Sequence, residues 1–255
     1  MHPVLFEIGS VSVSSYSATL LAAFIVSYIL SGPEFKRTGL RDELRDYVLM
    51  ACVLGGLMGA KLVFIMENAT MSEFLSNPMR YFASGLTMLG GFIGAMVLIT
   101  AVLWITKQNF LHVCDVVSPL FIVSSAIGRL GCLLVGDDYG VRSSLPWAMS
   151  FPQGSPPTTL RVHPTQIYEI IMLLAVFAYL WAVRKRPAPN GQLFGLALVL
   201  MGLERFLVEF IRTTTPSFVP GISVAQLMSL GCLSVGVILI AGLRLRSRAP
   251  QEQGT

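Results

Sequence analysis

Residues 113–140 read VCDVVSPLFIVSSAIGRLGCLLVGDDYG, an apolar stretch that contains one arginine and ends in a polar loop. Residues 113–136 are long enough to cross a bilayer, which takes about 20 residues. Arg129 lies within this stretch, where an arginine costs about 2.5–3.5 kcal/mol on insertion scales and therefore needs a partner or a task. Its guanidinium is a rigid fork of donors that fits a phosphate. The stretch therefore predicts a membrane helix with an arginine that binds an anion, and a phosphate at this depth usually belongs to a lipid.

The composition of the whole chain is that of a membrane protein. Of its 255 residues, 54% are hydrophobic and 13% are charged, whereas soluble domains average about 25% charged residues. The mean hydropathy is +0.69. The net charge of +4 comes from basic residues in short loops and at the C-terminus, so it indicates topology and not nucleic-acid binding. The cysteines lack metal-ligand spacing and are read as free thiols.

Seven apolar segments predict the fold. We expect an all-α integral membrane protein with about seven transmembrane helices and no cleavable signal peptide, forming a single polytopic domain over residues 1–255. A proline-rich stretch at about 137–165 is the longest one without apolar character, and we expect a structured loop there. The predicted helices lie at about 14–31, 46–66, 88–106, 113–136, 166–183, 191–211 and 222–243.

The orientation follows from the basic residues. Most of the 18 Lys and Arg residues flank the segments on the side of the C-terminus, and basic loops face the cytoplasm. An odd number of spans places the two termini on opposite sides. We therefore expect the N-terminus and the 137–165 loop outside and the C-terminus in the cytoplasm.

The sixth apolar segment carries charged residues three and four positions apart, so that they share one helix face. Arg129 and Cys132, three positions apart, share a face of the fourth segment. The charges either pair with each other, as Arg205 could with Glu209, or form an anion site from two arginines on different helices. Glycines beside both arginines favour the anion site. One helix face of the sixth segment holds Gly202, Arg205, Glu209 and Arg212.

The fifth segment opens with residues 163–169, which read HPTQIYE. Pro164 suits a first helical turn, where no amide donor is needed, so His163 could be a simple cap or loop residue. Histidine, glutamine, tyrosine and glutamate together nevertheless form a polar patch that a purely structural helix start would not need.

These motifs resemble the prolipoprotein diacylglyceryl transferase family, in the family's order. The first is Gly128-Arg129-Leu130-Gly131-Cys132 with Gly136 and Tyr139-Gly140, and the second is the 163–169 stretch. The third is GLERFLVEFIR at residues 202–212. The opening His2-Pro3-Val4-Leu5-Phe6, with Ile8-Gly9 and Tyr16, also looks like the family's start. The resemblance covers nearly the whole chain, and seven spans with the N-terminus outside is the family's arrangement.

The resemblance implies a lipid transfer in the bacterial inner membrane. The diacylglyceryl group of phosphatidylglycerol would pass to the lipobox cysteine of a prolipoprotein, with formation of a thioether and release of glycerol phosphate. Arg129 and Arg205 match the family's arginines and would stabilise the phosphate charge, with Glu209 holding Arg205. Both substrates lie in the bilayer, so we expect no cofactor and no metal. The substrate-binding candidates are Tyr16, Cys132, Gly136, Asp137, Tyr139, Gly140, His163, Gln166, Tyr168, Glu169 and Arg212.

One departure from the family concerns a histidine that commonly precedes a Gly-Gly pair at the third span. Leu89 takes its place before Gly90 and Gly91, and leucine cannot move a proton. Asp137, His163 and Glu169 are alternative bases. A thiol with a pKa near 8.5 is also a few per cent ionised at pH 7, so a dedicated base is not obligatory.

Two other functions stay open on the sequence alone. A catalytically diverged paralogue could bind phospholipid or lipoprotein without transfer. An organic-anion transporter would also use glycine-rich spans with buried arginines, but no internal duplication is visible. The expected partners are phosphatidylglycerol, prolipoprotein substrates and the bilayer, with no nucleic acid.

Overall fold

The computed structural model of the chain describes residues 4–8, 11–82, 85, 87–212 and 221–248. By its internal contacts the chain divides into two compact units. The first unit is formed by Met1–Leu30 and Cys114–Thr255, and the second by Ser31–Val113. The expectation of a single domain stays a prediction. Of the opening motif, His2, Pro3 and Gly9 lie outside the described residues.

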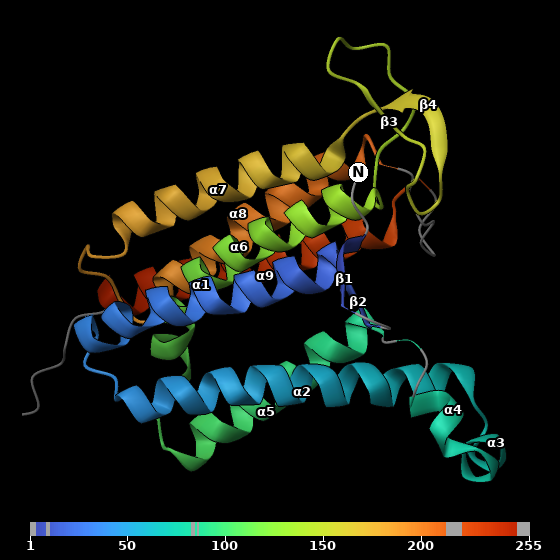
Figure 1. The fold of residues 1–255 in the computed structure, drawn as a ribbon. Coiled ribbons are helices and arrows are strands. Elements are labelled where there is room, and N and C mark those ends of the chain that lie inside the picture. The colour runs from blue at the N-terminus through green and yellow to red at the C-terminus, as the bar shows by residue number, and fades with distance from the viewer. Residues whose placement is uncertain (1–3, 9–10, 83–84, 86, 213–220, 249–255) are drawn as a thin grey trace, which may run out of the picture. The chain divides into compact units, whose positions relative to one another are not determined.

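Each of the predicted apolar segments is a helix, in the chain order drawn in Figure 1. Five helices are long and apolar enough to cross a membrane, namely α1, α2, α6, α7 and α9. The shorter α5 is apolar throughout, and α8 carries Glu204, Arg205 and Glu209 within its 18 residues. The bounds are α1 Ser15–Arg37, α2 Asp42–Asn68, α5 Met88–Ile105, α6 Phe110–Val135, α7 Thr165–Val183, α8 Gln192–Glu209 and α9 Val224–Arg248.

Three helices of the first unit share an apolar core. Ile122 and Ala126 of α6 pack with Leu173 and Leu180 of α7 and with Ala197 of α8. Burial of these side chains fixes the spacing of the three helices that carry the sequence motifs. The polar ends of α6, α7 and α8 are therefore positioned by packing that lies deeper in the bundle.

Asp115, a charged residue within α6, caps the N-terminus of α8. Its carboxylate accepts hydrogen bonds from the backbone N–H groups of Gly191, at 2.6 Å, and Phe194, at 2.7 Å. The first amides of a helix have no partner within it, and a negative charge beside them is favourable. This carboxylate thus has a structural task.

In the second unit, α2 and α5 pack backbone to backbone. A Cβ atom on Gly59 would clash with the carbonyl of Gly90, and one on Gly94 would clash with the carbonyl of Gly55. Small residues allow this approach, which is typical of helices packed in membranes. The short helices α3 (Met71–Ser76) and α4 (Pro78–Phe82) follow α2. Lys61 donates to the carbonyls of Tyr81, at 3.2 Å, and Gly85, at 2.9 Å, so it fastens this segment.

The protein is mostly helical, as predicted, and two small sheets accompany the helices. The strands β1 (Val4–Ile8) and β2 (Val11–Ser14) form an antiparallel hairpin ahead of α1. The expected loop at 137–165 holds a second antiparallel pair, β3 (Met149–Phe151) and β4 (Thr158–Val162). Arg161 fastens this pair by donating from Nε to the carbonyl of Ala148, at 3.1 Å. Figure 1 shows β3 and β4 where α7 begins.

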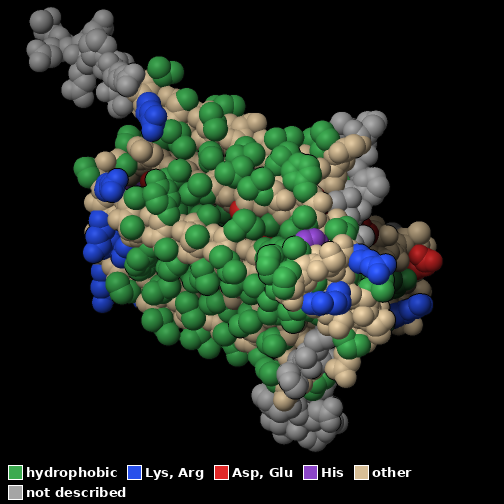
Figure 2. Space-filling view, turned by 90° about the horizontal axis from the view of Figure 1, so that it is seen from above, with side chains coloured by type: hydrophobic (Ala, Val, Ile, Leu, Met, Phe, Trp, Pro, Cys, Tyr) green, Lys and Arg blue, Asp and Glu red, His purple; other side chains and the backbone are tan. Residues whose placement is uncertain are grey.

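The helices expose large hydrophobic side chains. On α7 alone, Ile171 is 61% exposed and Tyr179 is 52% exposed. Figure 2 shows hydrophobic side chains over most of the face in view, with Lys and Arg side chains gathered near its edges. An apolar face bounded by charge is the surface expected of a protein in contact with lipid chains.

Candidate active site

The three sequence motifs meet through the backbone around Gly140. The N–H of Gly140 donates to the carbonyl of His163, and the N–H of Val141 donates to the carbonyl of Ile211, each at 2.9 Å. A Cβ atom on Gly140 would clash with the Ile211 carbonyl and crowd Thr165. Glycine is therefore required where the loop after α6 threads between the start of α7 and the end of α8.

Two fully buried side chains at the start of α7 hold the acidic loop in place. The hydroxyl of Thr165 donates to the backbone carbonyl of Asp138 at 2.6 Å. The side-chain amide of Gln166 donates to the backbone carbonyl of Asp137. Both residues are 0% exposed. The 163–169 motif therefore anchors the backbone that carries the two aspartates.

Glu169 lies at the centre of the site and faces three arginines from two segments of the chain. Its Oε2 is 3.1 Å from Nε of Arg129 on α6. Its Oε1 is 3.6 Å from Nη1 of Arg205 on α8 and 3.6 Å from Nη1 of Arg212, just beyond α8. A single carboxylate therefore brings together the arginines of the first and third motifs.

Two further carboxylates complete this group. Asp138 bridges Nη1 of Arg129, at 2.9 Å, and Nη2 of Arg212, at 2.6 Å. Glu209 pairs with Nη2 of Arg205 at 2.8 Å, one helical turn away. We call the whole group the arginine–carboxylate cluster, and its members are Arg129, Arg205, Arg212, Asp138, Glu169 and Glu209.

The cluster is buried on one side and open on the other. The side chains of Glu169 and Glu209 are 1% and 4% exposed, whereas that of Asp138 is 41% exposed. Three guanidinium groups face three carboxylates, so the charges balance. A buried charge without a partner would destabilise the fold by several kcal/mol. A new anion therefore either displaces one of these carboxylates or leaves the cluster with a net negative charge.

The two aspartates after α6 differ in electrostatic environment. Burial by itself would raise the pKa of Asp138, but the guanidinium groups of Arg212 and Arg129 outweigh it and hold that pKa below its usual range. Burial raises the pKa of Asp137, and its contact with the Cys132 thiol and the field of Arg129 offset this only in part. Asp138 is therefore a persistent anion, and Asp137 is the carboxylate that takes up a proton more readily.

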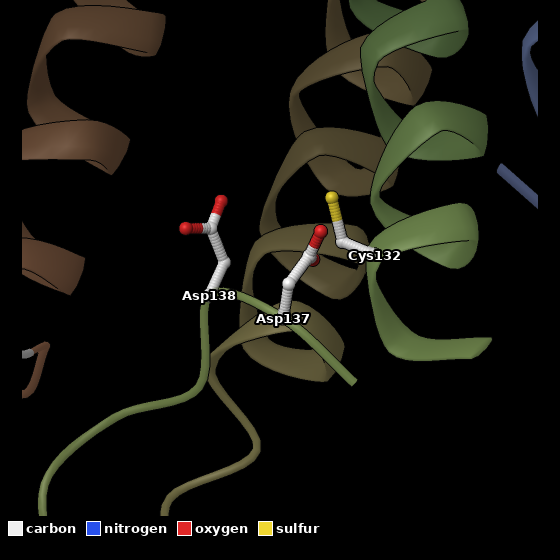
Figure 3. A group of neighbouring side chains, drawn as sticks. All are labelled: Cys132, Asp137 and Asp138. Atoms are coloured by element: carbon white, nitrogen blue, oxygen red, sulfur yellow. The ribbon is translucent and has the colours of Figure 1, made fainter. Parts of the chain in front are cut away.

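Cys132, Asp137 and Asp138 lie close together, as Figure 3 shows, and Asp137 turns its carboxylate toward the sulfur. Their potential ligand atoms lie within 4.8 Å of one another. Arg129 Nη1 is also 4.0 Å from the sulfur and already binds Asp138. A divalent cation would stand beside these guanidinium charges, so the surroundings suit an anion better than a metal.

Several predicted residues serve the loop instead of the cluster. The Tyr139 hydroxyl donates to the carbonyl of Pro156 at 2.7 Å, and its ring stacks on Phe151. Nδ1 of His163 is 3.3 Å from the Tyr168 hydroxyl, which accepts a 2.7 Å hydrogen bond from the indole of Trp147. These contacts support the β3–β4 region.

Two other predicted residues shape the ends of helices. Gly136 has a φ of +76° and ends α6, which turns the chain toward the two aspartates. Tyr16 is 46% exposed on α1, and a Cβ atom on Gly131 would lie 3.3 Å from its Cα. Gly131 therefore allows α1 to approach α6 beside Arg129.

Four residues of the site were missed in reading the sequence. Asp138 bridges two arginines, Thr165 anchors it, and Ser223 donates to Oε1 of Glu209 at 2.8 Å. Glu204 is 7% exposed, and its Oε1 has no hydrogen-bond partner in the described part of the chain. Two consecutive acidic residues directly after the segment that carries Arg129 could have indicated that Asp138 pairs with this arginine. Ser223 is followed three residues later by Gln226, a helix-start pattern that does not reveal a contact with Glu209.

Leu89 takes the place of the family's histidine and lies in the second unit. It is in the first turn of α5 and is 51% exposed. The described residues of the second unit thus present a leucine where a proton acceptor was expected from the resemblance.

Membrane-length helices around partly buried arginines and buried carboxylates define a class, that of multi-pass membrane proteins with a charged site between their helices. The model of the prolipoprotein diacylglyceryl transferase family matches residues 3–242, and the chain belongs to this family. It is 34% identical to a phosphatidylglycerol–prolipoprotein diacylglyceryl transferase of Vibrio vulnificus, over 94% of the chain and 91% of the relative. Relatives with the same description occur in Clostridium tetani, at 30% identity over 97% of the chain and 100% of the relative, and in Dechloromonas aromatica, at 34% over 93% and 94%.

Proposed function

We propose that this chain transfers the diacylglyceryl group of phosphatidylglycerol to the thiol of the lipobox cysteine of a prolipoprotein. The observation that carries the proposal is the convergence of Arg129, Arg205 and Arg212 on Glu169 in a member of this family. The bond between the glyceryl carbon and the phosphate oxygen breaks, and a carbon–sulfur bond forms. The thiol proton passes to a base, and glycerol phosphate leaves.

The arginines meet the main need of this reaction. Negative charge grows on the leaving phosphate, and donors already oriented toward it stabilise the transition state. Arg205 and Arg212 each keep a buried Nη1 without a hydrogen-bond partner in the described residues, and both atoms are only 3.6 Å from Glu169. These donors are available to an incoming oxygen. Glu209 and Glu169 hold the guanidinium groups in place.

Asp137 is the best placed of the three alternative bases. Glu169 is surrounded by three arginines, and His163 is engaged with Tyr168. The Oδ1 atom of Asp137 is buried without a hydrogen-bond partner among the described residues, and burial raises the pKa of this carboxyl. A base with a raised pKa accepts a proton from a thiol more readily. We assign Asp137 to the uptake of the thiol proton.

The topology belongs to the same proposal. Seven helices with the N-terminus outside and the C-terminus in the cytoplasm follow from the basic residues around the spans. This arrangement places the 137–165 loop and the cluster on the outer side of the bacterial inner membrane. Phosphatidylglycerol and the prolipoprotein would both reach the cluster from the bilayer.

A bacterium depleted of its own transferase offers the direct test. Expression of this chain should restore growth and lipoprotein maturation, and Arg129→Ala should not, although it inserts normally. The purified chain should also transfer labelled diacylglyceryl from phosphatidylglycerol to a lipobox peptide. Failure of both assays, with normal insertion of the chain, would favour the catalytically diverged paralogue.

A further inference from the structure

We infer that Asp138 is a displaceable internal anion: its carboxylate occupies the position of a ligand phosphate between Arg129 and Arg212, and it must swing out before a phosphate can bind to both of these arginines. This inference rests on the proposed function for the identity of the ligand. Its geometric basis is independent of catalysis, because it concerns which carboxylate of the cluster can leave.

The contacts of Asp138 resemble those of a bound phosphate. Oδ2 faces Nη1 of Arg129 at 2.9 Å, and Oδ1 faces Nη2 of Arg212 at 2.6 Å. A phosphate, like a carboxylate, offers several oxygens that accept charge-assisted hydrogen bonds from guanidinium groups. The carboxylate and a phosphate therefore compete for the same donors.

The other two carboxylates of the cluster cannot easily move away from their arginines. Glu169 is 1% exposed and faces three arginines, so its removal would leave uncompensated buried charge. Glu209 is 4% exposed and is held by Arg205 and Ser223. Both lie within helices, whose packing fixes the direction of their side chains. Asp138 is 41% exposed and lies in a loop.

The backbone at Asp138 can stay in place while its side chain moves. Thr165 holds the carbonyl of Asp138 at 2.6 Å, and the residue adopts a φ of +60°, which aspartate tolerates better than most residues. Rotation of the side chain alone would carry the carboxylate into solvent. The anchored backbone also returns it to the arginines once the ligand leaves.

The charge of the cluster favours such an exchange. Counting the six members of the cluster alone, three guanidinium groups face three carboxylates, and the departure of Asp138 leaves one positive charge in excess. The phosphodiester of a phospholipid carries a single negative charge and restores the balance. Glycerol phosphate, a monoester, carries about −1.5 to −2 near pH 7, by analogy with phosphoserine. Asp138 therefore competes with the lipid during binding and opposes retention of the more highly charged product.

The expected gain in phosphate affinity depends on the fraction of molecules in which Asp138 binds the two arginines. Apparent affinity falls by the fraction of molecules that are competent to bind. If Asp138 occupies the arginines in about nine molecules of ten, removing its charge tightens phosphate binding about tenfold. Asp138→Asn keeps the shape and removes the charge, and Asp138→Glu keeps the charge.

The first experiment measures binding of glycerol phosphate to the full-length chain in nanodiscs by calorimetry. Asp138→Asn should lower the dissociation constant about tenfold, and Asp138→Glu should stay near the unsubstituted chain. Glu73→Gln is the control, because it removes an equal charge from α3, where Glu73 binds Thr70. An unchanged or weaker affinity in Asp138→Asn, with a normal circular dichroism spectrum, would overturn the inference.

Kinetics separate the lipid from the free phosphate ester. With phosphatidylglycerol as substrate, Asp138→Asn should lower KM and strengthen inhibition by glycerol phosphate, because both anions compete with Asp138. A fall in kcat with unchanged KM and unchanged inhibition by glycerol phosphate would contradict the inference that Asp138 is displaced. If the unsubstituted chain transfers nothing, the proposed transferase activity is refuted. Tighter binding of glycerol phosphate in Asp138→Asn would then still support the displaceable anion.

A second measurement needs no variant. A water-soluble carbodiimide modifies free carboxylates more readily than those engaged by arginine. Saturating glycerol phosphate should therefore increase the labelling of Asp138 in the unsubstituted chain, as read by mass spectrometry of the loop peptide. Equal or lower labelling in the presence of bound glycerol phosphate would show that the carboxylate does not leave.

Discussion

Ser223 donates its hydroxyl hydrogen to Glu209 at 2.8 Å, so the residue directly ahead of α9 also holds the carboxylate that pairs with Arg205. The same hydroxyl accepts a hydrogen bond from the N–H of Gln226 at 3.1 Å, which caps the helix. Stability of α9 and the position of Arg205 are thereby linked through one side chain.

Ser223→Ala should affect both properties. Loss of the cap should destabilise the protein by about 1 kcal/mol, which lowers the midpoint of thermal unfolding in detergent. Transfer activity should fall severalfold, because Glu209 loses one of its two partners. Ser229→Ala is the control, since this hydroxyl donates only to Ala225 of its own helix in the described contacts. Equal behaviour of the two variants would contradict the link.

Arg129→Lys and Arg205→Lys should each reduce kcat/KM for transfer by about 10²–10³-fold, as does the loss of one oriented donor in other enzymes. Lysine keeps the charge but lacks the rigid planar fork of donors with which arginine can hold Glu169 and a phosphate oxygen in fixed directions. Arg142→Lys, in the exposed part of the loop, should leave activity near normal. Full activity of both cluster variants would assign the two arginines a purely structural role.

Glu209→Gln tests whether this residue positions Arg205 or moves a proton. The glutamine keeps the shape and a hydrogen-bond acceptor for Ser223, so activity should fall less than in Arg205→Ala. The comparison requires kcat and KM for both variants at equal levels of membrane insertion. If the glutamine variant were as inactive as Arg205→Ala, proton transfer by Glu209 would have to be considered.

The pH profile tests Asp137 as the base. Burial holds its pKa above the usual value of about 3.9, so the carboxylate is lost as the pH falls through this raised pKa. Transfer should decline on that acidic side. Asp137→Asn should lower the rate and remove the acidic limb, leaving only the rise toward the pKa of the substrate thiol near 8.5. Asp137→Glu should restore part of the activity and the limb. An identical profile in Asp137→Asn would exclude this base.

Leu89→His examines the departure from the family directly. Leu89 is half exposed in α5, so the substitution should leave folding intact. If this position supplies the base in relatives, the histidine should raise the rate near neutral pH about 10²-fold, the low end of general base catalysis. A rate that stays unchanged in an otherwise active chain would show that the position does not take the proton here.

The sequence predicts the long helices well and the contacts between them poorly. Apolar runs of membrane length are a local property, which is why each predicted segment is a helix. The strand Met149–Phe151 has three residues, too few to show an alternating pattern. The pairing of Arg129 with Glu169 depends on how α6 packs against α7, which periodicity does not reveal. Only the pair of Arg205 and Glu209, one turn apart on α8, could be proposed from spacing.

The charges of the cluster differ in how far apart along the chain their partners lie. Arg205 has its partner Glu209 on the same helix, whereas Arg129 precedes its partner Glu169 by 40 residues in the chain. Asp138 follows Arg129 by nine residues and binds it at 2.9 Å. Among the described residues, Asp138 is thus the residue nearest in the chain to Arg129 that forms an ion pair with it. The side chain that competes with phosphate therefore also gives Arg129 a partner that is local in the chain, whereas the pair with Glu169 requires α7 to pack against α6.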